Sequence, residues 1–336
     1  MRLSKLLMIA IIVVPLVFGA ATSQAQQIPK IRVAWVLPQG NWPSVLWEKK
    51  DVMRHVGKTY NVETIHFQGT PLMITALAAG ELDIADLAYS SFALAIENAN
   101  MEDLRIISDE VQDGVGRYYS NEYFVRKDSP IKKIEDLKGK VVASVGAGSA
   151  VDIALRAMLR KHGLEEKRDY TIVEAGFPNM KAMLAEKKVD LVSGALPFSF
   201  GLAEVGNALF TMKDALGGST QLAIWTARAG FLQKNRAAMV DLMEDAIRAA
   251  HFFLDPKNEE EVIEICGRVA KLPPSAFKGW VYTEKDQYRD PNMLPNLETL
   301  QKAIDTQQQL GFLKAKLDVK KYADLSIVKE AAARIR

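Results

Sequence analysis

The chain has 336 residues, of which 43 are Lys or Arg, 41 are Asp or Glu and only one is Cys. This near-neutral balance lacks the basic surplus of proteins that bind nucleic acids or anionic membranes, so we expect no nucleic-acid partner. The single Cys266 excludes an intramolecular disulfide and is expected to pack on a helix. The length is sufficient for two domains with separate hydrophobic cores.

The N-terminus has the pattern of a secretory signal peptide. Arg2 and Lys5 precede an apolar run over residues 6–20, and residues 23–25 (SQA) place small side chains where a signal peptidase reads. We expect residues 1–25 to be removed, which leaves a freely soluble periplasmic protein because no Cys near the cleavage site can carry a lipid. A membrane helix is the alternative, but the run is short for a bilayer.

The mature chain begins with two predicted strands, over residues 30–37 and 62–67, which are rich in β-branched and aromatic residues. The loop PQGNWPSVLW follows the carboxyl end of the first strand. Ligand contacts collect at such strand ends in open α/β sheets, so we expect Trp42 at a binding cleft. Trp47 is expected on a helix that follows this loop.

One stretch occurs twice, over residues 68–88 and again over residues 175–195. Each copy has a Gly that ends a strand, a Pro in the first helical turn, apolar residues at helical spacing, and an Asp before a short apolar strand. This pattern predicts two related α/β units whose helix N-termini face one ligand space. The alternative is a chance match between two ordinary strand, helix, strand segments.

The two copies differ where their helices begin. Thr70 can cap the helix that starts at Pro71, whereas Phe177 holds the equivalent position in the second copy and cannot cap. The first N–H groups after Pro178 therefore lack a local partner unless Asn179 helps. We expect a ligand oxygen or a water molecule to accept from them.

The segment after the first copy leads towards the second unit. Ser90 or Ser91 is expected to cap a helix, and Tyr89 lies either at the mouth of the cleft or packed in a hairpin. Residues 122–126 predict a strand. We place the first crossing between the two units near residues 118–123.

A Gly-rich turn follows the strand predicted over residues 140–145. In this turn, Gly148, Ser149 and Ala150 can present backbone N–H groups to an anion. The turn lacks the Lys-Ser/Thr ending of a phosphate loop and the third Gly of a dinucleotide fingerprint. Ser149 and Asp152 also form a self-capping pair, which is the alternative to anion binding.

The second copy ends in a loop that contains Pro197 and Phe198, at the carboxyl edge of the predicted sheet. Residues 220–226 predict a strand that crosses back into the first unit, with Trp225 either stacked on a ligand or packed at the hinge. From residue 235 onward the apolar residues follow helical spacing.

A chain that leaves one unit and later returns to it predicts a hinged pair of lobes rather than beads on a string. We therefore expect an α/β protein with a ligand cleft between two lobes joined by a two-strand hinge. Lobe one comprises residues 26–119 and 220–336, and lobe two comprises residues 120–219.

Signals of catalysis or metal binding are missing from the sequence. The histidines have no metal-ligand spacing, and no nucleophile motif is present, so we expect no metal, no cofactor, no catalytic residue and no enzyme activity. Asp86 is the one acid near the expected cleft. It can bind an amine or fix its own loop, and we favour the loop.

Three stretches, ALAAGELDIAD, IEDLKGKVVASVGAGSAVD and VDLVSGALPF, carry a resemblance that extends over essentially the whole mature chain. The sequence resembles the nitrate/sulfonate/taurine-type periplasmic solute-binding proteins of ABC importers. The resemblance implies a type II periplasmic-binding fold that closes on its ligand, as a monomer. It also implies delivery to a membrane permease with a cytoplasmic ATPase. Ligands of that family are small organic or inorganic anions.

The resemblance also implies a set of ligand contacts, and their aromatic side chains favour a planar organic acid such as a sulfonate or carboxylate. Whether Arg117 or Arg228 contacts the ligand stays open. The contacts fall on Gln39, Asn41, Trp42, Gln68, Gly69, Thr70, Asp86, Tyr89, Ser90, Gly148, Ser149, Ala150, Pro178, Asn179, Pro197, Phe198 and Trp225.

Two alternatives remain beside an importer subunit. The thiamine-pyrimidine synthase-like enzymes resemble this fold, but they carry a Cys-rich iron-binding segment and an active-site His. The single Cys and the signal peptide argue against that enzyme, and leave a protein that binds a thiamine-pyrimidine precursor. A secreted ligand sensor is the second alternative, which the sequence does not separate from a transport protein.

Overall fold

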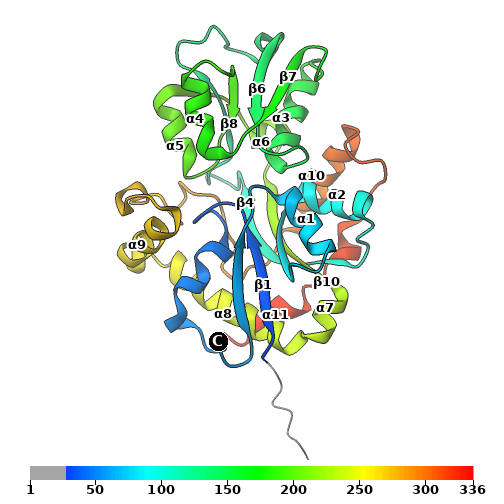
Figure 1. The fold of residues 1–336 in the computed structure, drawn as a ribbon, viewed down its shortest axis with the longest axis vertical. Coiled ribbons are helices and arrows are strands. Elements are labelled where there is room, and N and C mark those ends of the chain that lie inside the picture. The colour runs from blue at the N-terminus through cyan, green and yellow to red at the C-terminus, as the bar shows by residue number, and fades with distance from the viewer. Residues whose placement is uncertain (1–27, 336) are drawn as a thin grey trace, which may run out of the picture.

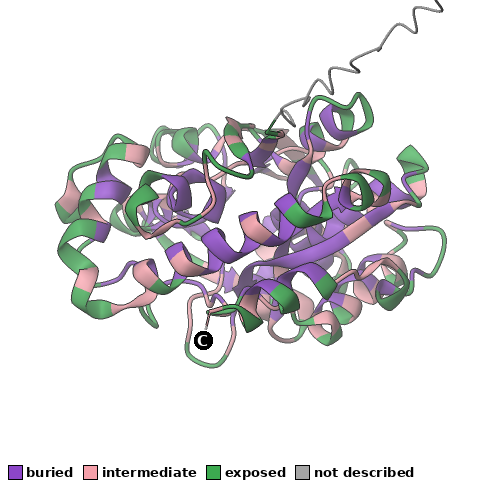
Figure 2. Cartoon of the chain, turned by 90° about the horizontal axis from the view of Figure 1, so that it is seen from below, coloured by how far each residue is buried: buried purple, intermediate pink, exposed green. Residues whose placement is uncertain are grey.

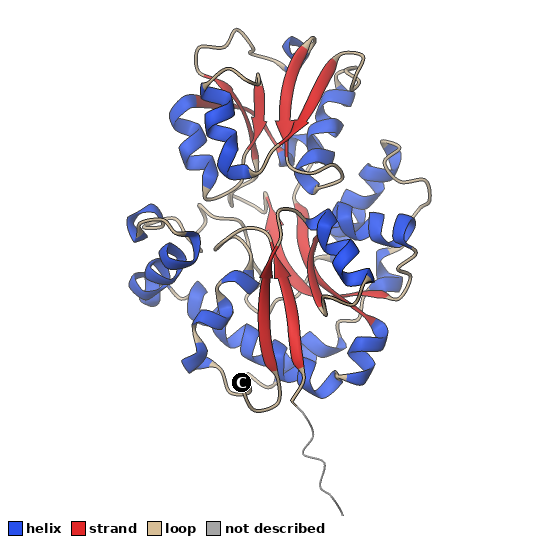
Figure 3. Ribbon diagram, viewed as in Figure 1, coloured by secondary structure: helices blue, strands red, loops and turns tan. Residues whose placement is uncertain are grey.

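The computed structural model describes residues 28–335, so the expected signal peptide lies outside the described residues. The strands form two five-stranded sheets. Each sheet forms the centre of one lobe, and the lobes are stacked along the long axis of the molecule (Figure 1). Helices cover the sheets of both lobes (Figure 3). The expected α/β fold with two lobes is confirmed.

The sheet of lobe one has the strand order β2-β1-β3-β10-β4. β1 pairs in parallel with β2 and β3, whereas β10 is antiparallel to both of its neighbours. The carboxyl ends of the parallel strands therefore meet at one edge, which faces lobe two. The strands are β1 (Lys30–Trp35), β2 (Asn61–His66), β3 (Ile84–Ala88), β4 (Leu104–Asp113) and β10 (Thr220–Arg228).

The sheet of lobe two, β7-β6-β8-β5-β9, repeats this topology. β6 pairs in parallel with β7 and β8, and β5 is antiparallel to β8 and β9. Each crossing between lobes delivers the chain into the fourth position of the other sheet, as β5 after β4 and as β10 after β9. The strands are β5 (Glu122–Arg126), β6 (Lys140–Ser144), β7 (Tyr170–Glu174), β8 (Leu191–Ser193) and β9 (Gly206–Thr211).

No strand of either sheet falls in the residue range predicted for the other lobe. The lobe boundaries themselves stay a prediction: lobe one denotes residues 26–119 and 220–336, and lobe two denotes residues 120–219. β3 illustrates how the core forms, because all of its residues are buried. The central strands and the inner faces of helices are buried, and the outer faces of the helices are exposed (Figure 2). The edge strand β2 is mostly exposed.

The helices pack around the two sheets. Those of lobe one are α1 (Thr70–Ala78), α2 (Tyr89–Ala99), α7 (Ala229–Lys234), α8 (Arg236–Leu254), α9 (Glu259–Ala270), α10 (Leu297–Gln309) and α11 (Ser326–Ala333). Those of lobe two are α3 (Ala150–Lys161), α4 (Phe177–Ala185), α5 (Phe198–Val205) and α6 (Met212–Leu216). Across residues 28–335, none of the helices has the length and hydrophobicity needed to cross a bilayer.

The structure corrects the expectation of continuous helical structure after residue 235. Between α9 and α10 the chain forms turns and one short 3-10 helix, Pro274–Ala276. Four prolines interrupt residues 271–296, and a Pro in a helix interior removes a hydrogen bond and clashes with the preceding turn. The segment runs along β4 instead, where the Gln112 N–H donates to the Tyr288 carbonyl at 2.8 Å.

Candidate functional site

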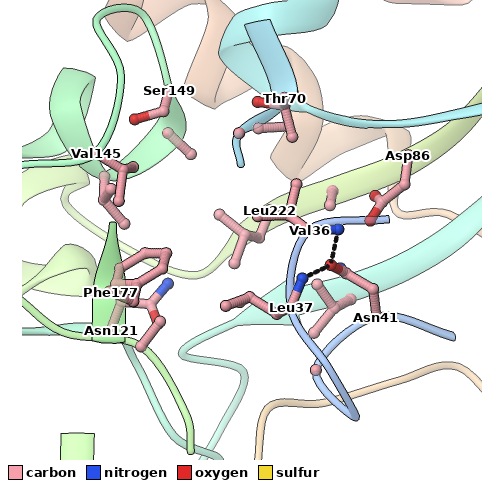
Figure 4. A pocket seen from close by; sticks show the side chains of 18 of the residues that line it. Val36, Leu37, Asn41, Thr70, Asp86, Asn121, Val145, Ser149, Phe177 and Leu222 are labelled. Atoms are coloured by element: carbon pink, nitrogen blue, oxygen red, sulfur yellow. Dashed lines mark hydrogen bonds between the residues drawn. The ribbon is translucent and has the colours of Figure 1, made fainter. Parts of the chain in front are cut away.

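A cavity of about 80 Å³ lies where the two lobes meet. Lobe one contributes the carboxyl end of β1, the start of α1 and parts of β3, β4 and β10, and lobe two contributes the starts of α3 and α4 (Figure 4). The lining is mostly apolar. It comprises Val36, Leu37, Gly40, Asn41, Gly69, Thr70, Asp86, Ala88, Val111, Asn121, Val145, Ser149, Ala150, Val151, Phe177, Ala195, Leu222, Ala223 and Gln287.

Both repeat copies direct the start of a helix to this cavity. Gly69 and Thr70 at the start of α1, and Phe177 at the start of α4, line it from opposite lobes. The loops before the two helices also face each other, since a Cβ built on Gly176 would lie 3.6 Å from the Gln68 Oε1 atom. The two related units therefore share one hollow.

The expected contrast between a capped and an uncapped helix is wrong. Gly69 is the N-cap of α1 and Gly176 is the N-cap of α4, and neither helix has a side-chain cap. Thr70 is the first residue of α1, and its hydroxyl pairs with the Ser91 hydroxyl at 2.7 Å. Pro71 and Pro178 have no N–H, and the Leu72 and Asn179 N–H groups donate to the Gly69 and Gly176 carbonyls, at 3.3 and 2.9 Å. The donors left at these helix starts are therefore the N–H groups of Thr70 and Phe177.

The Gly-rich turn before α3 is satisfied by its own residues. The Asp152 N–H donates to the Ser149 Oγ at 3.3 Å, and the Gly148 N–H donates to the Asp152 carboxylate at 2.9 Å. The self-capping alternative is therefore the observed arrangement, and Asp152 makes this N-terminus less receptive to an anion. Ser149 and Ala150 still line the cavity.

Ser90 does not cap a helix, because α2 already begins at Tyr89. Its hydroxyl instead donates to the Gly148 carbonyl at 2.7 Å, which joins lobe one to lobe two beside the cavity. Tyr89 is fully buried, which matches the packed alternative rather than a place at the cleft mouth. Among the described residues, its hydroxyl has no hydrogen-bond partner.

Asp86 is the only ionisable side chain in the lining of this cavity, as far as residues 28–335 extend. It lies on β3, is 1% exposed, and its Oδ1 atom has no hydrogen-bond partner in the described chain. Burial, and then the neighbouring Glu110, raise the pKa of Asp86 well above its usual range. Sequence analysis favoured a loop-fixing role, which would require hydrogen bonds to the loop that the structure does not show.

Glu110 lies on β4, behind the cavity wall, and is fully buried. Its carboxyl oxygens accept from the Trp42 backbone N–H and from the indole N–H of Trp225. Burial raises the pKa of Glu110 to about 8, although these two donors act in the opposite direction. Asp86 and Glu110 therefore form a buried pair of acids, and burial favours the neutral form of both.

Trp42, which was expected at the cleft, and Trp225, for which ligand stacking and hinge packing were both open, lie in the core. Trp42 is fully buried and stacks on Tyr282 with 5.1 Å between ring centroids. Trp225 is also fully buried and stacks on Trp47 at 6.0 Å. Neither lines the cavity, so the expected aromatic clamp is corrected to core packing around the Glu110 carboxyl.

Other expected contacts also lie outside the lining. Gln39 is fully buried, and its side-chain amide donates to Asp286 at 3.2 Å. Phe198 stacks behind Phe177, with 6.5 Å between centroids. The remaining expected contacts outside the lining are Gln68, Tyr89, Ser90, Gly148, Pro178, Asn179 and Pro197, and their role in binding stays a prediction.

The two undecided arginines make ion pairs away from the cavity. Arg117 pairs with Glu284 at 2.8 Å, and Arg228 pairs with Asp103 at 2.9 Å. Neither lines the cavity, and in the described chain no Lys, Arg or His does. A bound acid would therefore meet helix N-termini, hydroxyls and amides rather than a basic side chain.

Sequence analysis missed three lining residues that carry polar or aromatic groups. Asn121 is 2% exposed and its Oδ1 atom has no partner in the described part of the chain. The sequence feature that could have identified Asn121 was its position in the first crossing between the lobes, predicted near residues 118–123. Gln287 comes from the segment predicted to be helical, and Phe177 was considered only as a failed cap.

A family model described as the NMT1-like family matches residues 24–267. The chain belongs to the NMT1-like family. No curated protein sequence matches this NMT1-like chain. Its fold is nevertheless found in solved structures of low sequence identity.

Two of these structures are periplasmic binding proteins. The aliphatic sulphonate binding protein SsuA from Escherichia coli has a TM-score of 0.65 and 20% identity, with coverage of 87% of this chain and 91% of that one. The nitrate-binding protein NrtA from Synechocystis PCC 6803 has a TM-score of 0.71 and 15% identity, with coverage of 92% and 90%. The resemblance to solute-binding proteins and the two-lobed periplasmic-binding fold are confirmed.

The same fold also occurs in an enzyme. The desulfurization enzyme DSZB has a TM-score of 0.65 and 15% identity, with coverage of 92% of this chain and 100% of that one. In this NMT1-like chain the one Cys, Cys266, lies on α9 outside the cavity lining. Burial raises the pKa of its thiol to about 12, which disfavours the reactive thiolate.

Proposed function

We propose that this protein is the periplasmic solute-binding component of an ABC importer and that it binds a small organic anion between its lobes. The observation that carries the proposal is the cavity to which both repeat copies bring an uncapped helix start. Backbone N–H groups and the helix dipole at such positions favour negative charge. The apolar remainder of the lining suits a hydrocarbon or aromatic body.

Contacts between the lobes on both sides of the cavity support binding by closure. On one side, the Arg160 guanidinium of α3 donates to the Leu310 carbonyl and lies 4.7 Å from the centre of the Phe312 ring. On the other, Phe200 of α5 packs against Trp280 at 4.8 Å. We infer that ligand binding stabilises this closed arrangement about the β4–β5 and β9–β10 crossings.

Delivery to a membrane permease with a cytoplasmic ATPase follows from the same proposal. The sulphonate- and nitrate-binding proteins of similar fold support a place in the periplasm. The sequence pattern of residues 1–25 supports secretion into that compartment. We propose a monomer that binds its ligand without turnover.

The proposal is tested by a thermal-shift screen of residues 26–336 against sulfonates, aromatic and aliphatic carboxylates, nitrate and thiamine-pyrimidine precursors. A ligand at 100 times its dissociation constant should add about 2.7 kcal/mol to the free energy of unfolding. Stabilisation by one class of anion, with the compound recovered unchanged, is the expected result. The absence of any shift across all the acids, or conversion of the bound compound, would contradict it.

A further inference from the structure

The wall of the cavity contains a carboxyl group that no protein atom satisfies. Asp86 is 1% exposed, and its Oδ1 atom has no partner in the chain from residue 28 to residue 335. Figure 4 shows its carboxyl group on the side of the cavity that carries Asn41. The Asn41 Oδ1 atom already accepts from the Val36 and Leu37 N–H groups, at 3.0 and 2.6 Å. An ionised carboxylate in such a place would be desolvated without compensation.

The charged group that faces Asp86 from β4 is another acid. Glu110 has both oxygens engaged by N–H donors, from Trp42 and Trp225. Behind it are Asp109 on the same strand and the buried guanidinium of Arg289. Arg289 pairs with Asp286 at 3.1 Å and lies over the Trp42 ring, so it does not reach the cavity.

The elements next to β3 bring no free cation to Asp86 in the described chain. On β1, Arg32 pairs with Asp83 at 2.8 Å, before β3 begins. On β10, Arg228 lies at the end of the strand and pairs with Asp103. α1 contains no ionisable residue, and those of α2, Tyr89 and Glu97, are not cations.

We propose that Asp86 contacts the ligand as a protonated carboxyl group, and that its O–H donates a hydrogen bond to the acid group of the ligand. This inference rests on the proposed function and narrows its substrate class. In a cavity to which the described chain brings no basic side chain, a neutral Asp86 avoids charge repulsion with an incoming anion. Where Asp86 is ionised in the free protein, the ligand and the proton therefore bind together.

The same contact selects among acids. A carboxylate concentrates its charge on two oxygens and is a stronger hydrogen-bond acceptor than a sulfonate or nitrate, which spread theirs over three. The O–H of a neutral carboxyl group is matched best by the stronger acceptor. The substrate class is accordingly a small monocarboxylic acid with an apolar body, in preference to a sulfonate of the same size.

Two matched pairs of probes test this inference by calorimetry on residues 26–336: benzoate with benzenesulfonate, and butyrate with propane-1-sulfonate. We expect each carboxylate to bind more tightly than its sulfonate. Above the pH range in which Asp86 and Glu110 titrate, the affinity of the protein for each carboxylate should fall by up to about tenfold per pH unit. Titration at about pH 8, the value to which burial raises the pKa of Glu110, in phosphate and in Tris, whose ionisation enthalpies differ, should show net proton uptake by the wild-type protein.

The variant Asp86→Asn separates the proton from the hydrogen bond. Its amide still donates but carries no titratable proton, so the pH dependence of benzoate binding and the proton uptake should both disappear. Asp51→Asn, an isosteric change on the surface of lobe one, should retain the wild-type pH dependence. If Asp86→Asn does not fold, the comparison of phosphate and Tris buffers on the wild-type protein still tests the inference.

Other results would overturn the inference. Carboxylate binding that is independent of pH, or that strengthens as pH rises, would exclude a protonated Asp86. Tight binding of benzylamine that is lost in Asp86→Asn would make Asp86 an ionised acceptor for a cation. Sulfonates that bind tightly without proton uptake would leave the proposed function intact and exclude this contact, whereas failure of every acid to bind would reject the proposed function itself.

Discussion

Trp225 lies directly opposite Asp86, where β10 pairs antiparallel with β3. Its indole N–H donates to Glu110, so one buried ring lies between the acid in the cavity wall and the acid behind it. The tryptophan that sequence analysis placed on the ligand thus belongs to the support of the site. Its substitution should act on stability first.

We expect Trp225→Phe to lower the free energy of unfolding by about 1–3 kcal/mol, because Glu110 would lose a donor while remaining buried. Trp225→Ala should cost about 3–5 kcal/mol, since it also leaves a cavity in the core. Urea unfolding monitored by circular dichroism measures both values. A Trp225→Ala protein of unchanged stability would contradict the core placement.

Two substitutions should weaken binding, and of these only Thr70→Val should leave stability nearly unchanged, because Phe177 is 8% exposed and packs in the core. Thr70→Val removes the hydroxyl at the start of α1, and Phe177→Ala removes the ring at the start of α4; both residues line the cavity. We expect each to raise the dissociation constant at least about tenfold, which corresponds to about 1.4 kcal/mol. Leu72→Ala serves as the control, because that side chain lies in the same turn of α1 but is 55% exposed.

The stability of the protein should fall as pH rises from about 5 to about 8.5. Burial raises the pKa of Asp113 to about 6, of Asp109 to about 7 and of Glu110 to about 8, and raises that of Asp86 as well. Folded-state pKa values above the unfolded ones give stability that is complete at low pH and is lost as pH passes the folded values. Each carboxyl should contribute about 1.4 kcal/mol per pH unit between its unfolded and folded pKa.

Thermal unfolding measured across this interval, in the absence of ligand, checks the direction. Asp86→Asn should flatten the upper part of the curve, because it removes one of the acids. Groups with lowered pKa values, such as the exposed Asp51, change the stability only below this pH range. A midpoint that rises steadily towards pH 8.5 would contradict the buried-acid network.

The contact of Phe200 with Trp280 should favour the closed lobes. Phe200 is 46% exposed and belongs to lobe two, whereas Trp280 belongs to lobe one. We expect Phe200→Ala to weaken ligand binding by about 0.5–1.5 kcal/mol, the usual value of an aromatic pair. The double variant Phe200→Ala/Trp280→Ala should lose less binding free energy than the sum of the losses in the two single variants. Full additivity of the two losses would show that the pair does not contribute.

The general architecture was predictable from local patterns. Residues 122–126 form β5 as predicted, because the consecutive aromatic and β-branched residues Tyr123, Phe124 and Val125 favour a strand. The repeated Gly and Pro at the starts of α1 and α4 also correctly indicated one shared hollow. These signals depend on neighbours along the chain, which the sequence shows directly.

The composition of the cavity wall depended on contacts that the sequence does not show. Trp42 and Trp225 follow or belong to strands at the expected edge, yet both rings lie in the core. The Trp42 ring stacks on Tyr282, and the indole N–H of Trp225 donates to Glu110 on β4. Gln287 reaches the cavity through a segment whose prolines break the helical spacing seen around it. Asn121 enters the wall because the first crossing passes along it.

The most direct test of the central claim is a calorimetric titration of residues 26–336 with the acid that gives the largest thermal shift, repeated with Thr70→Val and with Phe177→Ala. A ligand held between the lobes should bind with one-to-one stoichiometry, and both variants, one in each lobe, should lose at least about tenfold in affinity. Unchanged affinity in both variants would show that the acid binds elsewhere and would contradict the account.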